Sequence, residues 1–328
     1  MRNVPSLDKS IINELQKSKN LLAFSAGSDS SALFFILLTY KIPFDIAIVD
    51  HGTRDQIENE LAYAQTLSQQ YNKKLYIKHV SFQSKSNFEK NARKVRYDFF
   101  NSLVNEFHYT HLLTAHHLFD QLEWFFMQFS RGAGLVELLG MQVRSTFFDI
   151  HLIRPLLNTP KQEIIDFLEK NDIQFFHDKS NDDITYTRNG FRQFLDPFMQ
   201  QYTSGIQKTL QYLEHDSNQL YSQHTFLQHK GLYIAPKSKQ FIRDIDLQLK
   251  KMGYLLSAKE RETLEVSNEI IVSRKIVVCM NQSTLFIAPF IQNIILPKEY
   301  KERYRKAKIP IKLRPYLYRE KINIDTIV

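Results

Sequence analysis

The sequence has almost no cysteine and no long hydrophobic run. Cys279 is the only cysteine among the 328 residues, which excludes an internal disulfide framework and a CxxC redox pair. The longest uninterrupted apolar run, residues 32–38, is far shorter than the roughly 20 residues that cross a bilayer. The first residues also lack the apolar stretch of a secretory signal. We therefore expect a cytoplasmic protein that does not span a membrane.

Internal repeats and low-complexity stretches are absent as well. Hydrophobic residues make up 43% of the chain and charged residues 24%, proportions that are typical of a globular protein with a large core. A chain of this length predicts two domains, because one domain usually has about 100–200 residues. Disordered and fibrous architectures are excluded as descriptions of the whole chain.

The positive charge is concentrated near the C-terminus. Of the formal net charge of +8, the segment 298–321 holds ten Lys or Arg residues against three Glu, so the rest of the chain is close to neutral. Four tyrosines are interleaved with these charges: Tyr300, Tyr304, Tyr316 and Tyr318. Such a segment neutralises phosphates and offers rings on which unpaired bases stack. Composition alone does not separate this nucleic-acid reading from a solvated basic tail.

The first half of the chain alternates short apolar runs with amphipathic stretches. The runs predict buried strands at 21–25, 45–50, 75–80, 111–115 and 151–155, with helices at 30–40, 56–71, 87–107, 118–130 and 160–171. This alternation predicts an α/β fold with a Rossmann-like parallel sheet of about five strands, covered on both faces. In such sheets, ligands bind at the carboxyl ends of the strands.

The composition changes after residue 200. Residues 202–230 resemble a helix that is rich in Gln and His, and they are followed by strand-like runs at 232–236, 269–280 and 285–289 around one charged helix at 257–266. We predict a catalytic domain at 1–210 and a smaller α+β domain at 211–328, which ends in the basic tail 298–321.

A loop of small residues follows the first predicted strand. It consists of Ser25, Ala26, Gly27, Ser28, Asp29 and Ser30. Small residues let the backbone wrap around a phosphate, which the N-terminus of the next helix also attracts. The hydroxyls of Ser25 and Ser30 add donors, and Asp29 is a candidate ligand for Mg²⁺. The chain has no GxxxxGK[ST] motif, so this is not a Walker loop, and an ordinary turn capped by Ser or Asp remains open.

A second polar cluster follows the fourth predicted strand. His116, Asp120 and Glu123 are spaced four and three residues apart, so on a helix they would share one face next to the phosphate loop. One histidine and two carboxylates suit a cation or acid–base catalysis. A polar, exposed helix start would explain the same residues.

Both clusters are similar to motifs of a known family. The loop resembles the SGGxDS signature of the PP-loop ATP pyrophosphatase superfamily, and residues 115–124 resemble the AHHxxDQxET segment of its tRNA(Ile)-lysidine synthetase subfamily. Further segments match that subfamily in order: VDHGTR at 49–54, ARKVRY at 92–97, FSRGAGL at 129–135, RPLL at 154–157 followed by KQEI at 161–164, and DKSN at 178–181 followed by YTRNGFR at 186–192. The resemblance covers roughly residues 20–200 and implies a PP-loop fold, also described as adenine nucleotide alpha hydrolase-like.

The resemblance implies an activity and a role for each matching residue. Such enzymes use ATP and Mg²⁺ to adenylate the wobble cytidine of a CAU-anticodon tRNA(Ile), and L-lysine then displaces AMP to give lysidine. The loop 25–30 would hold the phosphates and His51 the nucleotide. Arg96 and Arg188 would face the transferring phosphoryl group, and His116 would lie beside the nucleotide. Asp120 and Glu123 would bind lysine, and the basic tail would contact the tRNA. Which group acts as the general base and whether the chain forms a homodimer stay open.

Three positions depart from the family pattern. Ala26 stands where the first glycine is usual, Phe119 replaces an acidic residue and Trp124 replaces a threonine. An alanine disfavours positive φ, so the loop must either tolerate it or shift. The alternative function is therefore a non-catalytic RNA-binding protein with a degenerate PP-loop. A related tRNA thiolase is disfavoured because that chemistry carries sulfur on cysteines, and this chain has one.

Overall fold

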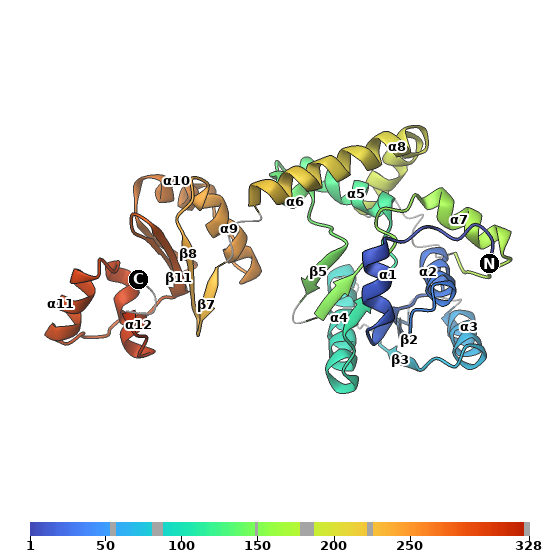
Figure 1. Ribbon diagram of the computed structural model, residues 1–328, viewed down its shortest axis with the longest axis horizontal. Coiled ribbons are helices and arrows are strands. Elements are labelled where there is room, and N and C mark those ends of the chain that lie inside the picture. The colour runs from blue at the N-terminus through green and yellow to red at the C-terminus, as the bar shows by residue number, and fades with distance from the viewer. Residues whose placement is uncertain (53–56, 81–87, 148–149, 178–186, 222–225, 325–328) are drawn as a thin grey trace. The chain divides into compact units, whose positions relative to one another are not determined.

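The computed structural model describes residues 1–52, 57–80, 88–147, 150–177, 187–221 and 226–324. The chain divides into two compact units, Met1–Ser217 and Asn218–Val328 (Figure 1). The division falls within helix α8 (Thr187–Tyr221), which also contains the boundary that we predicted at residue 210. None of the helices in these ranges is both long and apolar enough to cross a membrane.

The first unit is built on a six-stranded sheet in the order β3-β2-β1-β4-β6-β5. Five neighbouring strands run parallel: β3 (Leu75–His79), β2 (Phe44–Asp50), β1 (Asn20–Ala23), β4 (His111–Leu113) and β6 (Ile150–Ile153). This confirms the predicted α/β fold. The edge strand β5 (Arg144–Phe147) runs antiparallel to β6. The sequence analysis missed β5 because its residues, RSTF, form no apolar run.

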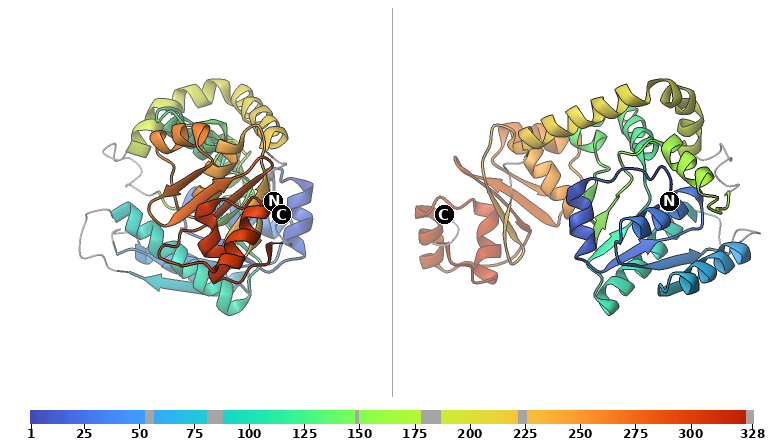
Figure 2. Two further views of the ribbon diagram at one scale, coloured as in Figure 1. Left: turned by 90° about the vertical axis from the view of Figure 1, so that its left-hand side faces the viewer. Right: turned by 45° about the vertical axis from the view of Figure 1, so that its right-hand side comes forward.

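Helices cover both faces of this sheet (Figure 2). Helices α1 (Lys9–Gln16), α2 (Ser28–Thr39), α3 (Ile57–Gln70) and α7 (Lys161–Lys170) share one hydrophobic core with strand residues such as Leu22. Helix α4 (Phe88–Phe107) packs on the other face, where Leu21 points. Successive side chains of a strand point to opposite faces of the sheet. Because helices cover both faces, Leu21 and Leu22 are both fully buried, and apolar residues follow one another along the strand.

A smaller core joins two helices that carry site residues. Helix α5 (Leu118–Phe129), the short α6 (Leu135–Leu138) and α8 bury a common apolar cluster, in which Leu118, Leu122, Leu195 and Met199 take part. The cluster fixes α8 against α5 within the first unit. As a result, polar residues on the adjoining turns of the two helices are brought together.

The second unit is a five-stranded antiparallel sheet in the order β7-β8-β11-β10-β9. Its strands are β7 (Leu227–His229), β8 (Leu232–Pro236), β9 (Glu269–Val272), β10 (Ile276–Met280) and β11 (Thr284–Pro289). Helices α9 (Phe241–Lys251) and α10 (Ala258–Val266) share a core with one face of the sheet. Helices α11 (Lys298–Lys306) and α12 (Arg314–Arg319), with the 3₁₀ turn η2 (Ile311–Leu313), share a core with the other.

Two predictions for this half of the chain are wrong. The predicted helix at 202–230 ends earlier, at Tyr221, and β7 occupies part of the predicted range; its predicted start coincides with the kink at Tyr202, where two helices join within α8. The basic segment 298–321 is not a tail, because its helices pack on the sheet. Tyr304 and Tyr316 are 2% and 3% exposed and belong to that core, so they offer no stacking surface for bases.

Candidate active site

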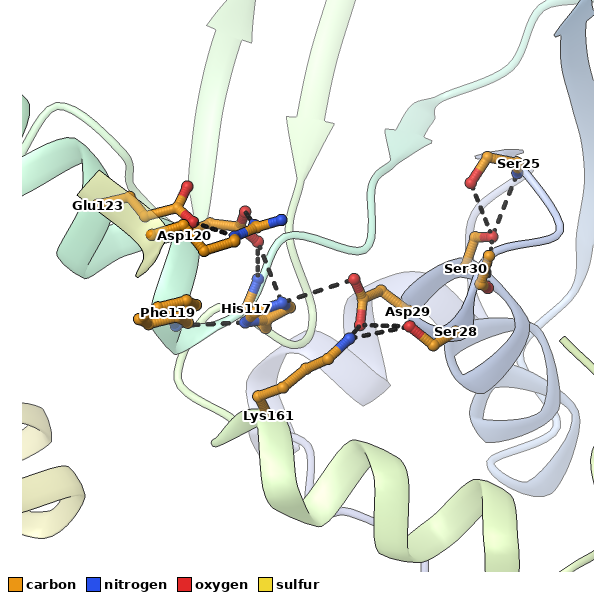
Figure 3. Close-up of polar contacts among 11 residues, drawn as sticks. Ser25, Ser28, Asp29, Ser30, His117, Phe119, Asp120, Glu123 and Lys161 are labelled. Carbon is orange, nitrogen blue, oxygen red and sulfur yellow. Dashed lines mark hydrogen bonds and ion pairs between the residues drawn. The ribbon is translucent and has the colours of Figure 1, made fainter. Parts of the chain in front are cut away.

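The phosphate loop lies at the carboxyl end of β1 and leads directly into α2 (Figure 3). The backbone N–H of Ser25 donates to Oγ of Ser30 (3.2 Å), and the Ser30 hydroxyl donates to the carbonyl of Gly27 (3.2 Å). Gly27 is the N-cap of α2 and provides no side-chain hydrogen bond to the helix. The alternative of an ordinary turn capped by Ser or Asp is therefore wrong. The helix start keeps the positive potential that attracts anions.

Ala26, which stands where the family usually has a glycine, adopts the left-handed backbone conformation. Its φ is +56° and its side chain is fully buried. The carbonyl of Ala26 accepts a hydrogen bond from the N–H of Phe176 (2.9 Å), and Gly27 forms an isolated parallel bridge with the same residue. These contacts hold the backbone in place, so the loop tolerates the alanine without losing its turn.

Asp29 of the loop is paired with a lysine from α7. The Lys161 ammonium forms an ion pair with Oδ1 of Asp29 and donates to Oγ of Ser28 (2.9 Å). Pro160 is the N-cap of α7, and Lys161 is therefore the first residue of that helix. Burial opposes ionisation of Asp29, but His117 and Lys161 outweigh it and lower the pKa of the carboxyl group. The loop thus contains the ionised carboxylate of Asp29, and the Lys161 ammonium of α7 lies next to it.

His117 lies between Asp29 and the second polar cluster. Its Nε2 atom is 3.5 Å from Oδ2 of Asp29 and 3.6 Å from Oδ2 of Asp120 (Figure 3). The ring is 2% exposed and acts as the N-cap of α5, where its Nδ1 accepts the N–H of Phe119 (3.2 Å). Burial disfavours the charged ring, but Asp120 and Asp29 outweigh it and raise the pKa of His117.

Asp120 and Glu123 lie on one face of α5 and both contact Arg192 of α8. The Nε of Arg192 donates to Oε1 of Glu123, and its Nη2 lies 3.4 Å from Oδ1 of Asp120. The two carboxylate residues are 7% and 1% exposed. Two carboxylate groups are thus held close together on Arg192 in a nearly dry environment, where electrostatic interactions with an added cation are strong.

Comparison with known proteins identifies the family to which the chain belongs. Residues 4–199 match the model of a PP-loop domain. The tRNA(Ile)-lysidine synthase of Campylobacter jejuni (strain RM1221) is 42% identical over 319 residues, which cover 97% of this chain and 98% of the relative. The chain belongs to the tRNA(Ile)-lysidine synthase family.

Two further matches differ in their sequence identity to this chain. The tRNA(Ile)-lysidine synthase of Helicobacter pylori (strain ATCC 700392 / 26695) is 39% identical, with 95% of this chain and 93% of the relative covered. Among solved structures, a U34-tRNA thiolase from Methanococcus maripaludis with its [4Fe-4S] cluster is 18% identical, with a TM-score of 0.49, over 65% of this chain and 77% of that one. The near full-length coverage of the relatives extends the family assignment to both units.

One part of the motif prediction for this lysidine synthase family member is wrong. His116 does not share a helical face with Asp120 and Glu123, because α5 begins only at Leu118. The ring of His116 instead lies 2.9 Å from the Thr114 hydroxyl, in the segment between β4 and α5. It still lies at the carboxyl end of a central strand, next to His117.

The remaining predicted residues are spread around the sheet edge. His51 directly follows β2 and is half-buried, with its ring 6.3 Å from that of Phe88. Arg96 is exposed on α4. Arg188 is in the first turn of α8, but its side chain lies outside the part of the chain that the structure describes. The roles assigned to these three residues stay predictions.

The sequence analysis missed three residues of the site: His117, Lys161 and Arg192. All three are inside segments that resemble the family, in AHHLFDQLE, KQEI and YTRNGFR. Lys161 and Arg192 are 132 and 72 residues away from Asp29 and Asp120, their respective carboxylate partners. Periodicity within one element does not reveal such contacts. The position of Lys161 just after Pro160, at a helix start on the ligand-binding edge, was the one available signal.

Two departures from the family pattern also find a structural place. Phe119 is 5% exposed and packs in the core that joins α5 to α8. Its ring lies 5.7 Å from the guanidinium carbon of Arg192. Trp124 donates its indole N–H to the carbonyl of Glu137 (2.8 Å) and so ties α5 to α6. Neither aromatic side chain disrupts the carboxylate pair.

Proposed function

We propose that this protein attaches L-lysine to C2 of the wobble cytidine of a tRNA(Ile) with a CAU anticodon. The product, lysidine, changes codon reading from AUG to AUA. The main support is the juxtaposition of two sites of opposite preference. An anion-attracting loop containing Asp29 adjoins the buried carboxylate pair Asp120 and Glu123, and His117 lies between them. A reaction between ATP and an amine needs both.

The first step that we propose is adenylation of the cytidine. The C2 oxygen attacks the α-phosphate of ATP, and pyrophosphate leaves. The loop 25–30 and the N-terminus of α2 bind the phosphates, and Lys161 is placed to move from Asp29 onto a phosphate oxygen. Arg96 and Arg188 are proposed to stabilise the charge that spreads over the transferring group. His51 and His116 are proposed to lie beside the nucleotide.

Asp29 is a suitable partner for Mg²⁺. In nucleotide sites, Mg²⁺ is usually bound by one or two carboxylates together with phosphates and water. The described residues contain no group of three or more His, Cys, Asp or Glu that would hold a metal alone, and a single carboxylate at the phosphate loop fits this shared mode. Bound there, Mg²⁺ would neutralise phosphate charge.

The second step is attack of the lysine ε-amine on C2, with AMP as the leaving group. Lysine arrives as an ammonium ion and must lose a proton before it becomes a nucleophile. Asp120 and Glu123 suit its recognition because they present two buried carboxylate groups close together. Asp120, Glu123 or His116 is proposed to accept the proton. The basic residues of 298–321 are proposed to contact the tRNA.

One incubation tests this proposal directly. The purified protein is mixed with ATP, Mg²⁺, labelled lysine and the CAU-anticodon isoleucine tRNA, and the tRNA is then digested to nucleosides. We expect labelled lysidine together with AMP and pyrophosphate. An Asp29→Asn variant should abolish the product while the variant still binds tRNA. If the tRNA binds but no lysidine forms, the protein is instead a non-catalytic RNA-binding protein.

A further inference from the structure

His117 contacts acidic residues of both halves of the site. Asp29 belongs to the phosphate loop at the start of α2, and Asp120 belongs to the carboxylate pair on α5. The single Nε2 atom of His117 lies 3.5 and 3.6 Å from one oxygen of each. This atom therefore lies within ion-pair distance of both carboxylates.

The other contacts of His117 fix which atom carries the hydrogen. Its Nδ1 accepts the N–H of Phe119 (3.2 Å), and its own backbone N–H donates to Oδ2 of Asp120 (2.9 Å). A neutral ring whose Nδ1 is an acceptor has its proton on Nε2. A charged ring would have one there too. The atom facing Asp29 and Asp120 is therefore an N–H donor in either charge state.

One donor cannot serve both carboxylates equally well, so a change at one acceptor affects the other. Without nucleotide, the two oxygens of Asp29 face Lys161 and His117. If a bound nucleotide drew the Asp29 carboxylate away from His117, Nε2–H would face Oδ2 of Asp120 alone. That carboxylate, which already accepts the backbone N–H of His117, would then be held by both donors, with its Oδ1 toward Arg192.

We propose that His117 is a positioning residue that couples nucleotide binding to lysine binding. This inference rests on the proposed function, because it assumes that lysine binds at Asp120 and Glu123. Bound nucleotide orients Asp120 and so raises the affinity for lysine. By thermodynamic linkage, lysine raises the affinity for nucleotide by the same factor. The enzyme thereby favours lysine binding once the activating nucleotide is in place.

Two substitutions separate the two contacts of the ring. In His117→Asn, the amide oxygen replaces Nδ1 as the acceptor for Phe119, and Asn is a favourable N-cap residue, but the side chain is too short to reach Asp29. In His117→Gln, the terminal amide lies near the position of Nε2, and the short-range cap is lost. The Asn variant therefore keeps the cap of α5 and loses the contact with Asp29. The Gln variant keeps a donor near Asp29 and loses the cap.

The experiment is calorimetric titration of lysine into the full-length protein, without nucleotide and with saturating Mg²⁺ and α,β-methylene-ATP, which is not cleaved at the α–β position. For the unmodified protein we expect lysine affinity to rise about fivefold or more with the analogue. In His117→Asn the two affinities should become equal, with an unfolding midpoint close to that of the parent. In His117→Gln part of the ratio should remain, although the helix start is weakened.

The outcomes separate this inference from the proposed function. If His117→Asn keeps the full ratio, or if the parent shows no ratio while it still makes lysidine, the coupling role is overturned and the function stands. If lysine binds under neither condition and no lysidine forms, the proposed function itself fails. Loss of the ratio in the Asn variant alone supports the coupling.

Discussion

Acidic side chains contact cations in two clusters, one in each unit, and the clusters differ in where their members come from. In the first unit, Asp29, Asp120 and Glu123 face the cations Lys161 and Arg192. In the second unit, Asp246 is 2% exposed in its side chain and contacts three cations, Arg243 (3.1 Å), Lys250 (2.7 Å) and Arg261 (3.2 Å). In the first cluster two buried carboxylate residues, Asp120 and Glu123, converge on Arg192, whereas in the second three cations converge on Asp246.

The origin of the charges explains why only the first cluster forms a site. Its members come from α2, α5, α7 and α8, which meet at the carboxyl edge of the parallel sheet. The partners of Asp246 come from its own helix α9 and from α10, which are close in sequence. A buried acid that contacts cations of neighbouring helices ties those helices together. Acidic side chains brought together from distant elements lie at the edge of the sheet where ligands bind.

The largest expected effect follows from removing the acid of the second cluster. Asp246→Ala leaves three cations without the carboxylate that they surround, and one of them, Lys250, is only 27% exposed in its side chain. Breaking a buried ion pair from one side costs about 3–5 kcal/mol, and we expect the lower end because the cations reach solvent. Denaturant unfolding should show a loss of about 3 kcal/mol.

The same variant checks the contrast between the clusters. Assayed well below its unfolding midpoint, Asp246→Ala should keep the parent KM for lysine. A rise in that KM comparable with the rise in a Glu123 variant would mean that the two clusters act together, and the contrast would be lost.

The next effect is on substrate binding in the first cluster. Glu123→Gln keeps the shape of the side chain but removes the charge that faces Arg192 and, in our proposal, the lysine ammonium. A hydrogen bond to a charged group contributes about 1.5–3 kcal/mol, so the KM for lysine should rise roughly 10- to 100-fold. The KM for ATP should change much less. Equal changes in both values would contradict the assignment of Glu123 to lysine.

The third effect concerns the basic segment, where charge and aromatic residues have separate tasks. Lys301, Arg305 and Lys308 are exposed, whereas Tyr304 lies in the core between them. Replacing the three cations with Gln should weaken tRNA binding about tenfold and flatten its salt dependence, because each lost phosphate contact removes a released counterion. Filter binding at several salt concentrations measures both.

Tyr304 provides the matched control for the basic segment. Tyr304→Ser should lower the stability of the second unit while the salt dependence of tRNA binding stays unchanged. If instead the triple variant binds tRNA as the parent does at every salt concentration, the exposed cations are merely solvated and the tRNA is bound elsewhere.

The same contrast shows how far sequence alone reaches. Most of the parallel sheet was predictable because strands such as β1, which was predicted at 21–25 and occupies Asn20–Ala23, are largely short apolar runs, and that pattern is local. The loop 25–30 and the pair Asp120 and Glu123 were predictable from short motifs. Lys161 and Arg192 were not, because their partners are distant in the chain and only the packing of α7 and α8 brings them together.

The second unit was harder to predict for a physical reason. Tyr304 and Tyr316 lie among charged residues, so the composition indicated a solvated or nucleic-acid-binding tail. Amphipathic helices bury one face while the other carries charge, and here the tyrosines take the buried face. Average charge hides this division, whereas burial of individual side chains reveals it.

The smallest expected effect returns to the phosphate loop. Ala26 has φ of +56°, a conformation that costs an alanine roughly 1 kcal/mol relative to glycine. Its methyl group is fully buried in the core of the first unit, and removing one buried methyl costs about 0.8 kcal/mol or slightly more. The two terms oppose each other, so Ala26→Gly should change the unfolding free energy by less than about 0.5 kcal/mol.

The KM for ATP is the more informative measurement on the same variant. Because the turn is already formed with alanine, Ala26→Gly should leave the KM for ATP within about twofold of the parent, a change of roughly 0.4 kcal/mol. An Ala26→Val variant is the counterpart, since a β-branched residue at positive φ is strained and should raise that KM strongly. A large gain in ATP affinity with glycine would show that the loop is held away from its binding geometry, and that alanine at this position limits the first step of the reaction.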